Sequence, residues 1–373
     1  MSGTGGTDVV VVGAGISGLV TGRRLAADGH RVVVLEGRDR VGGRLVSVEV
    51  GGVGLDLGAT WFWFHERRVN DLIGELGVAI HRQHLDGDAM YHDPRGSSRV
   101  EGNPIDVASG RFTGGADSLA RAVADELPPG SLRLGVAVSH ISTGPEGAVV
   151  THAEGRIECQ QVVLAVPPAL AVNRIGFEPP LPDRVVRLAR ATPVWMGAIA
   201  KVVAVYPTAF WRSRGLAGAA ISHFGPLREL HDMSGPDGSP AALFGFAPLG
   251  VGDSAPSEAE VVAQLVEIFG AEAAEPDRVI VQDWTSEEYT SPPGVAALGA
   301  YDKFGHPDFA QPVGHGRLHW SSTETAREAP GHIEGAIAGA ERAARNVATA
   351  LAGRTQSQRA SVRGGSPQER MNP

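Results

Sequence analysis

A glycine-rich turn between a strand and a helix constrains this chain more than any other feature of its sequence. Residues 8–12 form an apolar, β-branched run that predicts a buried strand. A helix is predicted over residues 15–27, ended by Gly29, and residues 31–35 predict a second buried strand. The chain therefore begins with a β-α-β unit.

The turn of this unit reads Gly13-Ala14-Gly15-Ile16-Ser17-Gly18. Gly13 permits the tight turn, Gly15 lets a pyrophosphate approach the backbone, and Gly18 lets the helix pack on the strand. The helix also offers its free N–H groups and its positive dipole end to the phosphates. This context favours an adenine dinucleotide over the alternative, a strand-turn-helix without a ligand.

Glu36 lies at the end of the second predicted strand, 18 positions after Gly18. A carboxylate there accepts hydrogen bonds from a ribose diol and repels a 2′-phosphate, which disfavours NADP. The alternative is a solvated charge at a strand end. Because Glu36 coincides with the glycine turn, we interpret it as a ribose ligand.

FAD and NAD share this pattern, so the choice between them depends on the residues that follow. The run Val34-Leu35-Glu36, followed by Arg40-Val41-Gly42-Gly43-Arg44, resembles the extended FAD fingerprint of the flavin amine oxidase superfamily, which includes monoamine, polyamine and L-amino acid oxidases. The glycine pair would bring backbone amides to the phosphates, and the arginines would add charge-assisted contacts. The resemblance implies cofactor contacts at Gly37, Arg38, Gly42, Gly43 and Arg44.

Later segments extend this resemblance to position 347. Residues 56–61 are similar to the family's second flavin segment, residues 111–127 to its Gly-Gly-x-x-x-Leu helix entry, and residues 162–168 to its strand and double-proline turn. Residues 317–326 resemble its last FAD segment, and residues 331–337 would start a helix aimed at the flavin. The resemblance implies further cofactor contacts at Gly58, Ala59, Thr60, Trp61, Val138, Thr323, Glu324 and Ile333.

The resemblance implies an α/β fold with two domains. A Rossmann-like, glutathione-reductase-like FAD-binding domain would comprise residues 1–80, 113–190 and 284–352. A second, α+β substrate domain on a mixed sheet would comprise residues 81–112 and 191–283. Small and apolar residues over 198–206, followed by Phe210-Trp211, predict strands of that second sheet.

Three helices have clear end signals. Ser257 and Glu260 predict a capping box for a helix that Gly270 closes. Asp117 is expected to cap a helix that ends before Pro128, and the last long helix is predicted over residues 331–351. Residues 353–373 are polar and predict a disordered tail.

Lys201, His332 and Trp284 are the candidate catalytic residues. Lys201 matches the lysine that contacts flavin N5 through a water in this family, and the alternative is a protective lysine on an edge strand. His332 stands where the monoamine oxidases carry a tyrosine of their substrate-flanking aromatic pair, so it could flank an amine, act as a base or simply cap a helix. Trp284 resembles a tryptophan near the flavin, and a core aromatic is the alternative.

Two departures from the family bear on chemistry. No cysteine lies over residues 284–301, where the covalently flavinylated members carry theirs, so FAD is expected to be non-covalent. The segment between Trp61 and Gly114 is short, and its aromatic run over 61–65 could line an open site, join a partner surface or pack in the core. A shorter cover implies a larger substrate or an oligomer, such as a homodimer, that excludes water.

Composition and charge limit the other classes of protein to which the chain could belong. The net charge of −9 gives no basic footprint for nucleic acid, and no segment is long and apolar enough to span a membrane. A single cysteine, Cys159, and the lack of a signal-like N-terminus favour a cytoplasmic protein. No metal site is expected.

The sequence thus predicts an FAD-dependent oxidase. We expect it to oxidise a C–N bond of a small-molecule amine to an imine, with hydride transfer to flavin N5 and reoxidation by O2 to give H2O2. A desaturase or carbon-centred oxidase that acts on a larger natural-product intermediate is the second interpretation. A catalytically silent flavoprotein scaffold is the third.

Overall fold

The β-branched run at the start of the chain lies at the centre of a parallel sheet. The structure is a computed structural model that describes residues 6–298 and 301–363. Strand β1 (Val9–Val12) pairs in parallel with β2 (Val32–Leu35) and with β14 (Gln161–Leu164). Strands β10 (Leu132–Arg133) and β21 (Leu318–Trp320) complete the sheet in the order β10-β2-β1-β14-β21.

Both faces of this sheet are covered, which explains its unbroken apolar strands. Val9 and Val11 point into a core formed with helices α1 (Ile16–Ala27), α3 (Asp117–Asp125) and α8 (Ile333–Arg363). Val10 and Val12 point into a second core on the other face, beside a sheet of order β13-β12-β11-β15. The carboxyl end of β1 is therefore held firmly against the N-terminus of α1.

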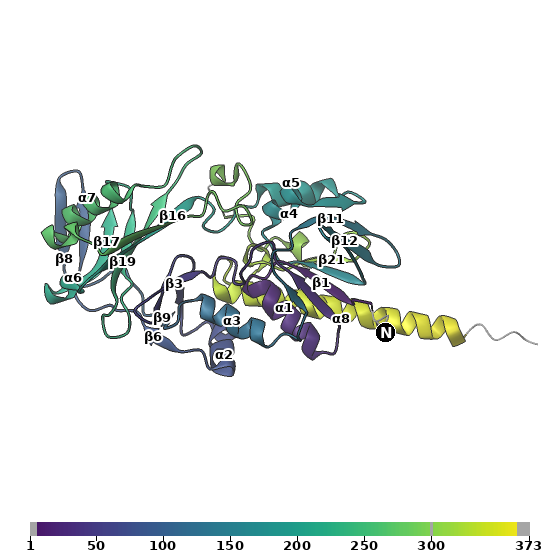
Figure 1. The fold of residues 1–373 in the computed structure, drawn as a ribbon. Coiled ribbons are helices and arrows are strands. Elements are labelled where there is room, and N and C mark those ends of the chain that lie inside the picture. Colours follow the sequence, from purple (N-terminus) through teal and green to yellow (C-terminus); the bar gives the residue numbers. More distant parts are fainter. Residues whose placement is uncertain (1–5, 299–300, 364–373) are drawn as a thin grey trace, which may run out of the picture.

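A seven-stranded sheet forms the other lobe of the molecule, at the left in Figure 1. Its order is β20-β16-β19-β18-β17-β7-β8, and it is mixed because only β17 and β7 pair in parallel. Helix α7 (Glu258–Phe269) packs on it through Val261, Leu265 and Ile268. The strands are β7 (Asp88–Asp93), β8 (Gly96–Val100), β16 (Ile199–Tyr206), β17 (Leu216–Ser222), β18 (Glu229–Asp232), β19 (Ala241–Pro248) and β20 (Arg278–Asp283).

The remaining elements connect or flank these sheets. The strands are β3 (Ser47–Val50), β4 (Val53–Asp56), β5 (Trp61–Phe62), β6 (Ile80–Arg82), β9 (Gly110–Phe112), β11 (Val138–Thr143), β12 (Ala148–His152), β13 (Gly155–Cys159) and β15 (Gly176–Glu178). The helices are α2 (Arg67–Leu76), α4 (Pro168–Arg174), α5 (Asp183–Ala191) and α6 (Phe210–Ser213), and the 3-10 helices are η1 (Ala271–Ala274), η2 (Val295–Ala297), η3 (Pro307–Ala310) and η4 (Thr323–Thr325).

The strands predicted over residues 8–12, 31–35 and 198–206 and the capping box agree with the structure. Ser257 accepts a hydrogen bond from the Glu260 N–H, and Glu260 accepts one in return. Strands β7 and β8 join β16–β20 in one sheet. Over the part of the chain that the structure describes, no helix is both long and apolar enough to cross a bilayer.

Three expectations about local structure are wrong. Phe210 and Trp211 lie in the short helix α6 rather than in a strand, and Trp211 is fully buried there. Asp117 is the first residue of α3, and no side chain caps that helix. Helix α8 continues to Arg363, so residues 353–363 are helical and not a disordered tail (Figure 1). Residues 364–373 of the expected tail lie outside the described residues.

Candidate functional site

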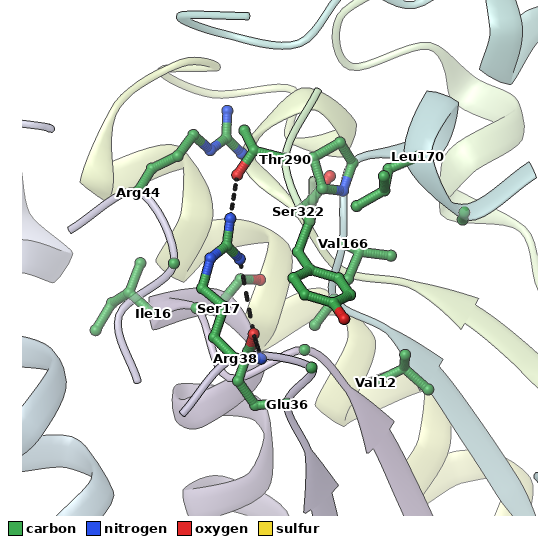
Figure 2. A pocket seen from close by; sticks show the side chains of 18 of the residues that line it. Val12, Ile16, Ser17, Glu36, Arg38, Arg44, Val166, Leu170, Thr290 and Ser322 are labelled. Carbon is green, nitrogen blue, oxygen red and sulfur yellow. Dashed lines mark hydrogen bonds and ion pairs between the residues drawn. The ribbon is translucent and has the colours of Figure 1, made fainter. Parts of the chain in front are cut away.

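A cavity of about 340 Å³ opens at the carboxyl ends of β1 and β2, where ligands bind in sheets of this kind. Figure 2 shows side chains from several distant segments around it. Fifteen residues predicted from sequence line the cavity: Gly13, Gly15, Ile16, Ser17, Glu36, Gly37, Arg38, Gly42, Gly43, Arg44, Ala59, Val138, Thr323, His332 and Ile333.

Some glycines of the turn border the cavity, and others allow the helix and the strand to pack closely. A Cβ on Gly18 would lie 1.9 Å from the Gly13 carbonyl oxygen, so Gly18 allows α1 to pack on β1. A Cβ on Gly15 would meet only the Gly42 carbonyl, at 3.9 Å, so Gly15 borders open space. Gly13 adopts a φ of 102°, which favours glycine. These observations support the three roles assigned from sequence.

Glu36 is buried beside the turn, with both carboxylate oxygens engaged. Its Oε2 accepts the Ala14 N–H at 2.8 Å, and its Oε1 accepts the Arg38 N–H at 3.0 Å. Each oxygen can accept a further hydrogen bond, because an ionised carboxylate has about four acceptor positions. Ala14 therefore orients Glu36 and does not itself line the cavity.

A segment that sequence analysis did not single out closes one side of the cavity. The Arg38 guanidinium donates to Glu287 at 2.6 Å and to Thr290 at 2.9 Å, as the dashed line to Thr290 in Figure 2 shows. Tyr289 lies against Gly37, where a Cβ would be 2.7 Å from its ring. No local pattern marks these partners, because about 250 residues separate them from Arg38.

Arg44 and Glu324 form an ion pair at the edge of the cavity. Arg44 Nη1 lies 2.6 Å from Glu324 Oε1 and also donates to the Trp195 carbonyl at 3.1 Å. The Trp195 N–H donates to Glu324 at 3.3 Å. Glu324 is fully buried and lies outside the cavity lining, so the geometry supports a role in orienting Arg44. Trp195 does line the cavity, and sequence analysis did not single it out.

Lys201 is buried on β16, an inner strand between β19 and β20, so the edge-strand alternative is wrong. Its Nζ donates to the Gly58 carbonyl at 2.9 Å and to Thr60 Oγ1. Burial lowers the pKa of Lys201 to about 7, Asp56 opposes that shift, and Arg111 adds to it. Gly58 and Thr60, which flank the cavity-lining Ala59 in the chain, therefore contact Lys201 and are not part of the cavity lining.

Trp284 and Trp61 are also absent from the cavity lining. The Trp284 ring is fully buried and its Nε1 donates to the Leu57 carbonyl at 2.9 Å, so it supports the segment around Gly58. Trp61 packs edge-on against His231 and donates to Gln83 at 3.0 Å. Both tryptophans are placed to hold neighbouring segments rather than to touch a ligand in the cavity.

His332 does line the cavity, at the start of α8. Its Nδ1 lies 2.6 Å from Glu66 Oε1, and its ring stacks on Trp63 at 4.6 Å. Glu66 was not singled out from sequence, whereas Trp63 belongs to the aromatic run over 61–65. The other aromatic residues of that run have different environments, since Phe62 is buried in the core and Phe64 is 47% exposed.

The residues present fit an FAD diphosphate and its adenosine. No side chain caps the N-terminus of α1, whose N-cap is Gly15, so its amides remain available at the cavity. Arg38 and Arg44 bring cationic groups to the same lining, and Glu36 would supply an acceptor for the ribose. A cradle of this kind suits an anionic dinucleotide.

Known flavin-containing proteins are similar to this chain along most of its length. The family model described as flavin containing amine oxidoreductase matches residues 16–110 and 91–348. AofH of Mycobacterium tuberculosis, whose name describes a flavin-containing monoamine oxidase, is 30% identical over 92% of this chain and 97% of its own. A putrescine oxidase of Kocuria rosea is 27% identical over 88% of this chain and 92% of its own.

Solved structures show the same fold. A putrescine oxidase bound to putrescine matches with a TM-score of 0.80 at 23% identity, over 92% of this chain and 99% of its own. Cyclohexylamine oxidase from Brevibacterium oxydans matches with a TM-score of 0.80 at 22% identity, over 93% of this chain and 99% of its own. With the family model matched along most of its length, the chain is an oxidoreductase of the flavin-containing amine oxidoreductase family, and FAD is its cofactor.

Proposed function

We propose that this protein oxidises the C–N bond of a small-molecule amine to an imine, with O2 as the electron acceptor and H2O2 as the second product. FAD, when bound, accepts the hydride equivalent at N5 and passes its electrons on to oxygen. The observation that carries the proposal is the buried Lys201, bonded to the segment over 58–60 that the family resemblance assigns to the flavin.

The chain's own residues supply binding and orientation. The α1 amides near Gly15 would hold the diphosphate, Glu36 the adenosine ribose, and Arg44 would add positive charge. The N-terminus of α8, with Ile333 in the cavity lining, directs its positive dipole end toward the cavity. A negative charge that develops on the cofactor would be stabilised there without reorganisation.

Lys201 is proposed to serve the oxidative half of the cycle. Its ammonium contacts the Gly58 carbonyl and Thr60 and also lies over the Phe244 ring at 4.3 Å. With a pKa lowered to about 7 by burial, Lys201 can hold or release a proton at Nζ near neutral pH.

His332 is proposed to flank the substrate amine. It is the candidate catalytic side chain that lines the cavity, and it stands where related oxidases carry an aromatic ring. Trp284 is proposed to act indirectly, because its bond to the Leu57 carbonyl holds the flavin-facing segment in place. The non-covalent state of FAD is also part of this proposal, since Cys159 is buried in β13.

A desaturase or carbon-centred oxidase is the second candidate, and one observation favours it. Between α2 and α3 the described chain forms only the strands β6–β9, and this stretch contributes no helix that could cover the site. A short cover of this kind would suit a larger, non-amine intermediate.

The test is anaerobic mixing of the purified yellow protein with putrescine, cyclohexylamine, benzylamine and tyramine. Bleaching of the flavin spectrum by at least one amine, followed by peroxide on admission of air, is the expected result. A flavin that no amine bleaches would refute amine oxidation. Bleaching by a non-amine alone would select the second candidate.

A further inference from the structure

The segment before α2 contains a carboxylate that contacts the His332 ring directly. Glu66 is 4% exposed, and its Oε1 lies 2.6 Å from His332 Nδ1. Its Oε2 accepts the Trp63 N–H at 2.9 Å. One oxygen thus faces a backbone N–H donor and the other faces the imidazole, an arrangement that suits a carboxylate.

This contact decides which ring nitrogen of neutral His332 carries the proton. An ionised carboxylate only accepts hydrogen bonds, so Nδ1 must donate to Glu66. Nε2 then keeps its lone pair and is the nitrogen free to take a proton. A carboxylate plays the same part for the imidazole of hydrolytic triads, where it sets the tautomer and orientation.

Trp63 fixes the plane of the same ring. Its indole stacks on the imidazole at 4.6 Å with an interplanar angle of 27°. Asn70 of α2 donates to the Trp63 carbonyl at 2.9 Å and to the Glu66 carbonyl at 2.6 Å, so the loop itself is held. The His332 side chain nevertheless keeps 36% of its surface exposed, which leaves a route for a proton to leave.

Other charged groups around His332 are already paired. Arg44 on the cavity wall is neutralised by Glu324. Arg68 of α2 is paired with Glu334 of α8, which also accepts the Val69 N–H, and with Glu328 of the loop before α8. Glu66 is therefore the carboxylate in direct contact with the ring among the described residues.

We propose that Glu66 and Trp63 are positioning residues that make His332 the proton acceptor for the substrate's ammonium group. This inference rests on the proposed amine oxidation. The substrate N–H bond breaks, its proton binds His332 Nε2, and the electron pair stays on the substrate nitrogen. No group is oxidised in this step, which yields a neutral amine and an imidazolium beside Glu66. The neutral amine is the form that can lose a hydride equivalent from its α-carbon.

The pH dependence of flavin reduction tests the proposal. The FAD-loaded protein is mixed with cyclohexylamine or putrescine, and the rate of flavin reduction is measured at each pH. Glu66→Gln should slow anaerobic flavin reduction about 10- to 100-fold near pH 7. As the pH rises past about 10.4, the ordinary pKa of an aliphatic ammonium, most of the amine is already neutral in solution, so the variant should approach the parent rate there. Glu66→Asp, which keeps the charge, should recover part of the loss.

His332→Phe keeps the stacking on Trp63 and removes the acceptor, so it should show the same recovery at high pH even if Glu66→Gln folds poorly. Glu334→Gln is the matched control, since it removes another buried carboxylate between α2 and α8 without touching His332. Its pH profile should match the parent's.

A rate loss in Glu66→Gln and His332→Phe that is constant with pH, or absent, would overturn the inference while leaving amine oxidation intact. A parent protein whose flavin is reduced by no amine would instead refute the proposed function, and this inference with it.

Discussion

At the scale of single residues, Lys201 shows how burial turns an ordinary side chain into a titrating group. The lysine lies on an inner strand, among Phe244, Phe246 and the segment over 58–60, and no water-exposed surface remains on it. Burial disfavours the ammonium ion more than Asp56 restores it, so the pKa falls from 10.5 to about 7. This shift affects stability as well as chemistry.

The stability of the protein should therefore depend on pH through Lys201. Between about pH 7 and pH 10 the unfolded chain binds a proton that the folded chain has released, so this group makes stability rise with pH over that window. The variant Lys201→Met lacks this titrating ammonium group and therefore serves as the reference. The melting temperature of the parent relative to Lys201→Met, both loaded with FAD, should increase from about pH 7 to about pH 10. A difference that stays constant over this window would show that Lys201 titrates at its ordinary value.

At the scale of elements, the junction of β1 and α1 must satisfy two requirements, the packing of the helix on the strand and the proposed binding of the cofactor. Gly18 is required by the close approach of helix and strand, whereas Gly15 borders open space at the cavity. The two glycines stand three positions apart on the same turn, so substitutions at them separate the two requirements within one element.

Gly15→Ala and Gly18→Ala should fail in different ways. Gly15→Ala should fold with a melting temperature close to that of the parent without cofactor, yet bind FAD at least tenfold more weakly, because its methyl group would face the proposed diphosphate site. Gly18→Ala should lose stability by about 2 kcal/mol or more, since its Cβ overlaps the Gly13 carbonyl. Thermal melts and FAD titration by flavin fluorescence check both outcomes. Equal FAD affinity in Gly15→Ala and the parent would contradict the assigned diphosphate site.

The elements also show what could be predicted from sequence. The strands β1 and β2, the α7 capping box and the glycine turn depend on neighbours within a few residues, so local patterns indicate them correctly. The contacts of His332 with Glu66 and of Arg38 with Glu287 join residues about 250 or more positions apart. No local pattern encodes such contacts, and only the folded chain reveals them.

Errors in the prediction have equally specific causes. Phe210 and Trp211 have high strand propensity, but they pack as a short helix against Tyr206 because tertiary contacts override propensity. Residues 353–363 lack apolar periodicity, yet they continue a helix that is already nucleated by its packing against α1.

At the scale of the whole molecule, the attachment of FAD follows from where the single cysteine lies. Cys159 pairs with Ala148 in the sheet of order β13-β12-β11-β15 and is buried, and burial raises the pKa of its thiol to about 12. A thiol held in that state is a poor nucleophile. It also lies outside the cavity lining.

FAD should therefore leave the protein on denaturation. After acid precipitation and centrifugation, the yellow colour and the flavin fluorescence should appear in the supernatant, with a colourless pellet. Cys159→Ser should behave identically. Flavin that remains with the denatured chain would show a covalent bond to another side chain.

The short connection between α2 and α3 should also affect the range of substrates. Among the described residues only β6–β9 connect α2 to α3, and the neighbouring Phe64 and His332 keep much of their surface exposed. A site of this kind excludes bulky groups weakly, because rejection requires clashes or unpaired polar groups. Within a series of cyclohexylamine derivatives with increasingly large N-substituents, kcat/KM should fall less than about tenfold, since each added methylene can contribute only about 1 kcal/mol of binding. Stopped-flow flavin reduction across the series measures this dependence. A fall of a thousandfold on adding one phenyl group would show that another part of the chain or a second subunit closes the site.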